Sequence, residues 1–145
     1  MKIALASDHA GFELKEKVKE MISKHIVTDF GTGNSDPIDY PDSGFKAATA
    51  VSIGKCERGI LICGSGLGMS IVANKVHGIR AALCQTKQFA QLSRMHNDAN
   101  ILVLSGRFIS GYLAKDIIDV WLSTEFEGGR HQKRIDKISD YEKEE

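Results

Sequence analysis

Short apolar runs alternate with stretches whose apolar residues recur at helical spacing, from one end of the chain to the other. The apolar runs predict five strands, at residues 2–6, 26–30, 59–63, 79–84 and 101–105. The helical spacing predicts helices at residues 11–24, 42–53, 66–74, 86–95, 110–122 and 132–143. Asp42 or Ser43 is expected to cap the second helix and Thr86 the fourth. The stretch 31–41 is rich in turn-forming residues and predicts a loop.

This alternation predicts an α/β fold, because parallel strands joined by helical crossovers place helices on both faces of a sheet. The sheet is expected to be five-stranded and mostly parallel. Such sheets bind ligands at the carboxyl ends of their strands, where Asp8, Cys63 and Arg107 fall. The polar triplet before the fifth strand is the one placement that this rule does not explain.

The sequence has no internal repeat or linker, so residues 1–145 are expected to form a single domain. The last predicted helix has few apolar residues, mainly Ile135, Ile138 and Tyr141. We expect it to pack on a partner subunit, with a frayed surface helix as the alternative.

Composition narrows the class of protein. Nineteen basic and nineteen acidic side chains cancel, so net charge favours neither nucleic acid nor a membrane surface as partner. No apolar run approaches the ~20 residues of a membrane span, and the N-terminus reaches Asp8 and His9 too early for a signal peptide. The cysteines at positions 56, 63 and 84 are odd in number and lack CxxC spacing, which is typical of free thiols in a reducing compartment. The expected location is cytoplasmic.

The segment Cys63-Gly64-Ser65-Gly66-Leu67-Gly68 joins the third predicted strand to the third predicted helix. A strand, a glycine-rich turn and a helix N-terminus make an anion site, because their backbone N–H groups converge. A helix N-terminus also favours the thiolate form of a neighbouring cysteine, so Cys63 is a candidate base or nucleophile. A small buried structural cysteine is the competing interpretation.

This loop does not match the common glycine-rich motifs. A dinucleotide fingerprint requires a third glycine where Met69 stands, and a P-loop requires a Gly-Lys-Ser/Thr ending. A nucleophile elbow requires glycine where Cys63 stands. A cysteine phosphatase would have arginine at the position of Met69. These four classes are therefore disfavoured.

Two polar segments are candidates for proton transfer or sugar binding. Asp8 and His9 directly follow the first strand, although Asp8 also suits the cap of the next helix. The triplet His96-Asn97-Asp98 is expected in the loop before the fifth strand, and its imidazole could move protons near neutral pH. A plain loop explains Asn97 and Asp98 equally well.

Arginines are the candidates for phosphate binding. Arg130 and Arg134 lie four residues apart on one helix face, and Arg107 follows the fifth strand. Paired guanidinium groups suit bidentate phosphate contacts, although such a run is often only a solvated face. The five histidines are far apart in sequence and show no HxxxH or HExxH spacing, so neither a metal nor a cofactor is expected.

Taken in order, these motifs resemble the type B ribose-5-phosphate isomerases, whose relatives include the galactose-6-phosphate isomerase subunits. The resemblance covers essentially the whole chain. Its segments are Ser7-Asp8-His9-Ala10-Gly11, Asp39-Tyr40-Pro41-Asp42, Cys63 to Ser70 with Ala73-Asn74-Lys75, His96-Asn97-Asp98, and Gly129 to Arg134. It implies a Rossmann-like three-layer sandwich, homodimers with active sites at the interface, and often a dimer of dimers. It also implies metal-free interconversion of ribose 5-phosphate and ribulose 5-phosphate.

The same resemblance implies roles for individual residues. Cys63 would move a proton between C2 and C1, and His96 would open the sugar ring with help from Asp8. The loop implied to hold the enediolate consists of Gly64, Ser65, Gly66, Leu67, Gly68, Met69 and Ser70. Phosphate would be bound by His9, Arg107, Arg130 and Arg134, and the pocket completed by Tyr40 and Asn97. Another branch of the family has a glutamate as base a few residues downstream, where this chain has no carboxylate.

Three alternatives stay open. A hexose-6-phosphate isomerase, acting on allose or galactose 6-phosphate, would differ in pocket depth around Tyr40 and Gly64 to Gly68. A non-catalytic sugar-phosphate sensor needs only the arginines, so the presence of Cys63 and His96 argues against it. A thiol redox protein would need a resolving cysteine at CxxC spacing, which the sequence lacks.

Overall fold

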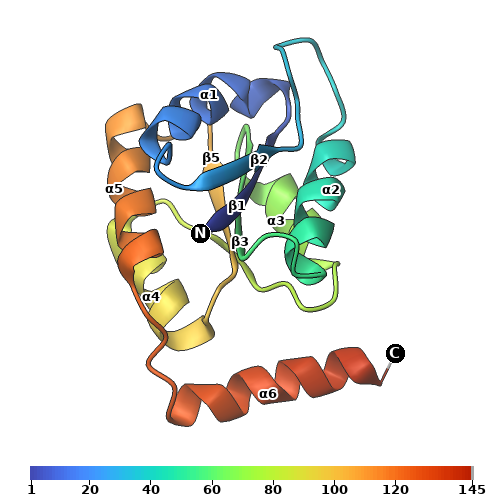
Figure 1. Ribbon diagram of the computed structural model, residues 1–145, viewed down its shortest axis with the longest axis vertical. Coiled ribbons are helices and arrows are strands. Elements are labelled where there is room, and N and C mark those ends of the chain that lie inside the picture. Colours follow the sequence, from blue (N-terminus) through green and yellow to red (C-terminus); the bar gives the residue numbers. More distant parts are fainter. Residues whose placement is uncertain (145) are drawn as a thin grey trace.

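Five parallel strands form the centre of the molecule in the computed structural model, which describes residues 1–144 (Figure 1). They are β1 (Lys2–Ser7), β2 (Ile26–Asp29), β3 (Arg58–Cys63), β4 (Ala81–Leu83) and β5 (Ile101–Ser105). Their order is β2-β1-β3-β5-β4, and every neighbouring pair is parallel. The predicted five-stranded α/β sheet is confirmed.

The strand order contains a switch point between β1 and β3. The chain goes from β1 to β2 on one side, and β3 then pairs with β1 on its other side. The register places Cys63 beside Ser105 and Ser7 beside Ile62, so the carboxyl ends of β1, β3 and β5 meet at one edge. Ligand sites of open parallel sheets lie at such a point, outside the carboxyl ends of the strands.

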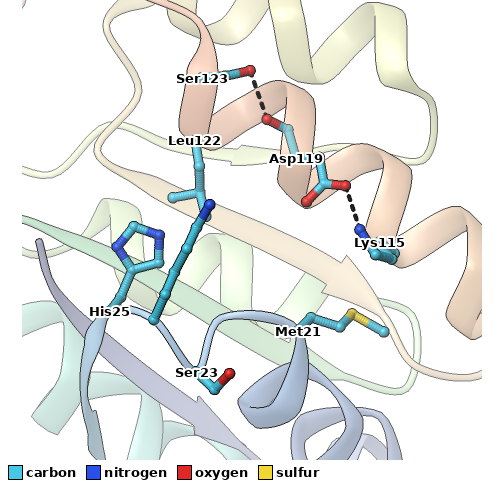
Figure 2. Close-up of a pocket in the computed structure, with 8 residues that line it drawn as sticks. Met21, Ser23, His25, Lys115, Asp119, Leu122 and Ser123 are labelled. Atoms are coloured by element: carbon cyan, nitrogen blue, oxygen red, sulfur yellow. Dashed lines mark hydrogen bonds and ion pairs between the residues drawn. The ribbon is translucent and has the colours of Figure 1, made fainter.

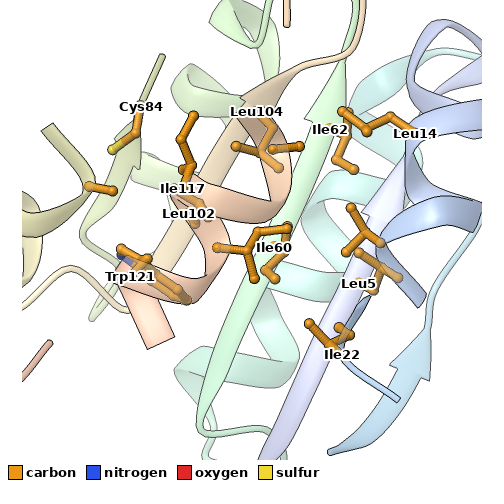
Figure 3. Packing of buried hydrophobic residues seen from close by; sticks show 14 of the residues in the cluster. Leu5, Leu14, Ile22, Ile60, Ile62, Cys84, Leu102, Leu104, Ile117 and Trp121 are labelled. Carbon is orange, nitrogen blue, oxygen red and sulfur yellow. The ribbon is translucent and has the colours of Figure 1, made fainter. Parts of the chain in front are cut away.

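Helices cover both faces of the sheet. They are α1 (Phe12–Met21), α2 (Tyr40–Ser52), α3 (Leu67–Asn74), α4 (Lys87–Asn97), α5 (Gly111–Ser123) and α6 (Arg130–Lys143), with a 3₁₀ turn at His9–Gly11. Alternate strand side chains point to opposite faces, and both faces are apolar. Leu5, Ile60 and Leu102 pack against α1 and α5 (Figure 3), whereas Ala6 and Leu61 belong to the core beneath α2 and α3.

Helix α6 stands apart from these layers, beyond the amino ends of the strands (Figure 1). Only His131 and Ile135 of this helix are buried, while Ile138 and Tyr141 are 49% and 68% exposed. Near its C-terminus, Glu142 accepts a hydrogen bond from the N–H of Gly78 at 2.8 Å. The helix therefore leaves much of its small apolar surface uncovered within one chain.

Several element ends differ from their predicted positions. Helix α1 ends at Met21 rather than at residue 24. Helix α2 begins two residues early, because Pro41 suits its first turn and Asp39 takes the N-cap position. The prediction of Asp42 or Ser43 as cap is therefore wrong. Thr86 does cap α4, since its Oγ1 accepts from the N–H of Phe89 at 3.1 Å.

Helix α4 is longer than predicted, and this moves a predicted loop into a helix. Its last turn contains His96 and Asn97, and it ends at Asp98 in the left-handed conformation (φ 46°, ψ 46°). Arg94 Nη1 lies 2.8 Å from Asp98 Oδ1, an i,i+4 ion pair that supports the extra turn. Among the described residues, no helix has the length and apolarity needed to cross a membrane.

Candidate active site

The predicted base lies at the switch-point crevice. Cys63 is the last residue of β3, is 4% exposed, and belongs to the core beneath α2 and α3. Asp8 directly follows β1, and its N–H donates to the carbonyl of Ile62 at 3.3 Å. Arg107 follows β5 and lies over Gly64, with Cδ and Nη1 3.4 Å from where a Cβ on that glycine would be. The predicted placement of these polar residues at strand carboxyl ends is confirmed.

The loop after Cys63, residues 64–69, offers N–H groups without hydrogen-bond partners among the described residues, and we call it the anion loop. Gly66 has a left-handed conformation (φ 82°), and a Cβ there would lie 2.5 Å from Cδ1 of Leu83, so only glycine fits. The N–H of Leu67 is occupied, because it donates to Ser65 Oγ at 3.2 Å. The N–H groups that donate to no described residue are those of Gly64, Ser65, Gly66, Gly68 and Met69. Together with the N-terminus of α3, they can stabilise an anion.

Tyr40 and Met69 relate to this loop in different ways. The ring of Tyr40 lies flat against Gly68, since a Cβ on that glycine would come within 2.6 Å of it. Tyr40 thus borders the anion loop, as the pocket prediction requires. Met69 is fully buried, and its sulfur would be 2.7 Å from a Cβ on Gly44. Its side chain faces the core, so Met69 can offer a ligand only its backbone.

Asp8 and His9 each have one fixed partner. Asp8 Oδ1 accepts from the N–H of Gly11 at 3.0 Å, so it caps the 3₁₀ turn while its second oxygen has no partner among the described residues. His9 Nδ1 accepts from the N–H of Ile38 at 3.1 Å. A neutral His9 ring therefore carries its proton on Nε2, where it can donate to an anion. A hollow of about 400 Å³, bordered by both residues and Tyr40, opens beside them.

The remaining predicted residues lie at the opposite edge of the sheet. Helix α4 runs back from the carboxyl edge, so His96 and Asn97 at its end lie near the start of β5. Arg130 and Arg134, on the first turns of α6, are exposed and pair with no described residue. We call these four residues the amino-edge group. The lengths of β3 and α4 separate it from Cys63 by about 15–20 Å.

The other predicted residues form the carboxyl-edge group. Its members are Asp8, His9, Tyr40, Cys63, Gly64, Ser65, Gly66, Leu67, Gly68, Met69, Ser70 and Arg107. One chain therefore holds two half-sites rather than one complete site. The position of His96 before the fifth strand already set it apart in the sequence, and the resemblance implied sites at a subunit interface. The sequence did not show which edge Arg130 and Arg134 occupy, because the placement of α6 depends on contacts made only in the folded chain.

His131 is not among the predicted site residues, yet it contacts one of them. Its ring stacks on His96 with centroids 4.3 Å apart and planes 14° apart. Burial, followed by the charges of His96 and Arg130, lowers the pKa of His131. Its Nε2 has no hydrogen-bond partner in the described part of the chain and lies 3.6 Å from Glu127 Oε2. The two histidines are far apart in sequence, so no spacing motif reveals the stack.

Among the described residues, the rings of His96 and His131 together with Glu127 form the group whose arrangement is most similar to a metal site. One ligand atom from each lies within 4.8 Å of the others. A metal ion must lie close to the plane of each imidazole that binds it, and two stacked, nearly parallel rings do not converge on one point. The arrangement fits a stacked pair of histidines better than a metal centre.

A hollow of about 580 Å³ lies between the end of α1 and helix α5 (Figure 2). His25, Lys115 and Asp119 line it, and Lys115 Nζ is paired with Asp119 Oδ2 at 2.7 Å. None of the predicted site residues borders it. The hollow is therefore separate from both half-sites.

Comparison with known proteins connects this geometry to a family. The model of the Ribose/Galactose Isomerase family matches residues 3–138. The ribose-5-phosphate isomerase B of Escherichia coli is 48% identical over 140 residues, covering 95% of this chain and 94% of that protein. The structure of ribose-5-phosphate isomerase B from Clostridium thermocellum superposes with a TM-score of 0.97, at 53% identity and 99% coverage of both chains.

A second solved structure carries a ligand. It is the ribose-5-phosphate isomerase B of Mycoplasma genitalium with bound ribulose 5-phosphate, with a TM-score of 0.96 and 44% identity over 99% of this chain and 97% of that one. Both the fold and the overall sequence thus agree over nearly the full length. The chain belongs to the Ribose/Galactose Isomerase family.

Proposed function

We propose that this protein interconverts D-ribose 5-phosphate and D-ribulose 5-phosphate as an aldose–ketose isomerase. The observation that carries the proposal is the position of Cys63 at the switch-point crevice, directly before a loop of unpaired N–H groups. Relatives named ribose-5-phosphate isomerase B support the substrate, and one of them holds ribulose 5-phosphate. The reaction belongs to pentose phosphate metabolism.

The reaction needs a base and a site for developing negative charge. The thiolate of Cys63 takes the proton from C2 of the open-chain aldose, and the C–H electrons form the C1–C2 double bond while the carbonyl π electrons move to O1. The same thiol then returns a proton to C1 as the O2 proton moves to O1, which yields the ketose. The N–H groups of the loop stabilise the enediolate oxygens, a type of contact worth about 3–4 kcal/mol in comparable oxyanion sites.

The other residues open and hold the sugar. His96 opens the furanose ring with Asp8, and Tyr40 and Asn97 complete the pocket. His9 and the arginines at positions 107, 130 and 134 bind the phosphate, so that its binding energy holds the reacting carbons in place. No step requires a metal or a cofactor.

The site is complete only when two copies of the chain meet. Within one chain, the amino-edge group lies at the far edge of the sheet from Cys63, and Arg130 and Arg134 pair with none of residues 1–144. We propose a homodimer, or a dimer of such dimers, in which α6 of one copy brings these arginines to the carboxyl-edge group of the other. The exposed Ile138 and Tyr141 support contact of α6 with another chain. Three free cysteines support a cytoplasmic location.

The substrate assignment is tested by assaying the protein in EDTA with ribose 5-phosphate, allose 6-phosphate and galactose 6-phosphate. We expect the highest kcat/KM with ribose 5-phosphate and no loss of rate from the chelator. Turnover of a hexose phosphate alone would support the proposed proton transfer and contradict the assignment of ribose 5-phosphate as substrate. Binding of all three sugars without turnover would favour a sensor instead.

A further inference from the structure

The anion loop is held from behind by the turn that follows β5. The carbonyl of Cys63 accepts from the N–H of Gly106 at 2.8 Å, and the carbonyl of Gly64 accepts from the N–H of Arg107 at 3.0 Å. The next carbonyl, that of Ser65, accepts from Ser105 Oγ at 2.5 Å. Three consecutive carbonyls thus point toward one short segment, residues 105–107.

This arrangement determines where the N–H groups of the loop point. In a trans peptide the N–H is directed opposite to the preceding carbonyl. Because these three carbonyls face the turn after β5, the N–H groups of Gly64, Ser65 and Gly66 face away from it, and none of them donates to a described residue. Two of the three carbonyls are held by backbone N–H groups. The third depends on a side chain.

We infer that Ser105 is a positioning residue for the anion loop: its hydroxyl holds the Ser65 carbonyl and thereby aims the N–H of Gly66 at the oxyanion. Ser105 is fully buried at the end of β5, where strand pairing with Cys63 fixes its position. Its hydroxyl has no other hydrogen-bond partner among the described residues. The turn packs closely against the segment after β1, since a Cβ on Gly106 would lie 3.0 Å from the carbonyl oxygen of Ala10.

The inference rests on the proposed isomerase function and adds a residue that acts without touching substrate. Ser105 would affect the transition state more than the ground state, because negative charge on the sugar oxygen develops only during proton transfer. Loss of its hydroxyl should therefore lower kcat and leave KM nearly unchanged. A merely structural residue would instead change stability, or both constants together.

The test compares Ser105→Ala with Ser93→Ala, a matched control. Ser93 is also buried, and its hydroxyl also donates to a backbone carbonyl, that of Ala90 at 2.8 Å, but it lies on α4. We expect Ser105→Ala to lower kcat about tenfold, a fraction of the effect of deleting an oxyanion donor outright. Affinity for a hydroxamate mimic of the enediolate should fall by a similar factor, while Ser93→Ala keeps both values. Ser105→Cys, which retains a weak donor, should lie between.

Two results separate this inference from the proposed function. If the unaltered protein isomerises ribose 5-phosphate and Ser105→Ala keeps kcat within about twofold, the positioning role of Ser105 is contradicted while the proposed function still holds. If the unaltered protein has no turnover, the function is overturned, and the amide resonances of Gly64 to Gly66 still test the loop. Selective shifts of these resonances in Ser105→Ala and Ser105→Cys, but not in Ser93→Ala, would support the positioning role. Unchanged resonances would contradict it.

Discussion

Replacement of Cys63 by alanine is expected to lower kcat for ribose 5-phosphate by about 10³-fold, within the range typical of a lost general base. The thiol is the proposed proton carrier, and alanine offers no group that can accept the C2 proton. Binding of ribulose 5-phosphate, measured by calorimetry, should stay within about threefold, because the arginines and the loop N–H groups remain. The effect should therefore appear in kcat and not in KM.

Cys84→Ala is the matched control for this loss. Cys84 is also buried, in the core beneath α1 and α5, and burial raises the pKa of its thiol to about 11. It therefore stays protonated at neutral pH and takes no part in the proposed chemistry. We expect Cys84→Ala to keep kcat unchanged while it lowers the free energy of unfolding by about 1 kcal/mol. A Cys63→Ala protein with nearly normal kcat would show that the base has been misassigned.

Replacement of Asp29 by asparagine is expected to lower the free energy of unfolding by about 2–3 kcal/mol. Lys15 is fully buried on α1, and its Nζ lies 2.5 Å from Asp29 Oδ2 at the end of β2. Removing the carboxylate leaves this buried ammonium without its main counter-charge. The estimate lies below that for a fully buried pair because the side chain of Asp29 is 26% exposed. Urea denaturation of both proteins at pH 7 measures the difference.

The same ion pair predicts a dependence on pH. Burial alone would raise the pKa of Asp29, but hydrogen bonds from Lys15, Lys19 and the N–H of Gly31 outweigh it and bring the value below the ordinary 3.8. A lowered folded-state pKa contributes stability that is present above about pH 4 and is lost as the pH falls through the folded-state value. The difference in free energy of unfolding between the unaltered protein and Asp29→Asn should therefore shrink as the pH falls below about 4.

A second substitution serves as the control for this ion pair. Asp119→Asn removes the exposed partner of Lys115 and should leave stability unchanged. If Asp29→Asn behaved in the same way, Lys15 would not depend on Asp29 for its counter-charge.

Most of the fold follows from local patterns in the sequence. Strand β5 has the predicted bounds of 101–105, because its apolar run ends abruptly on both sides. The ends of α2 and α4 were predicted less well. Pro41 starts α2 early, and the pair Arg94–Asp98 extends α4 by a turn. Such terminal effects depend on single contacts rather than on periodicity.

The candidate site was predictable as a set of residues but not as an arrangement. The rule that ligands bind at strand carboxyl ends correctly grouped Asp8, Cys63 and Arg107. His96 did not fit that rule, and the structure gives the reason: it ends a helix that returns to the opposite edge. Neither Ser105 nor His131 could be singled out from the sequence. Ser105 resembles any other strand residue, and the stack of His131 on His96 forms only in the folded chain.

The central claim is that each active site combines the carboxyl-edge group of one copy with the amino-edge group of another. Subunit complementation between Cys63→Ala and the double variant Arg130→Ala/Arg134→Ala tests it most directly. Each variant alone should be nearly inactive at low substrate concentration. After subunit exchange, activity should rise to about one quarter of normal, because about half the dimers are mixed and each mixed dimer holds one site with both halves intact. A mixture that stays as inactive as its two components would contradict a shared site.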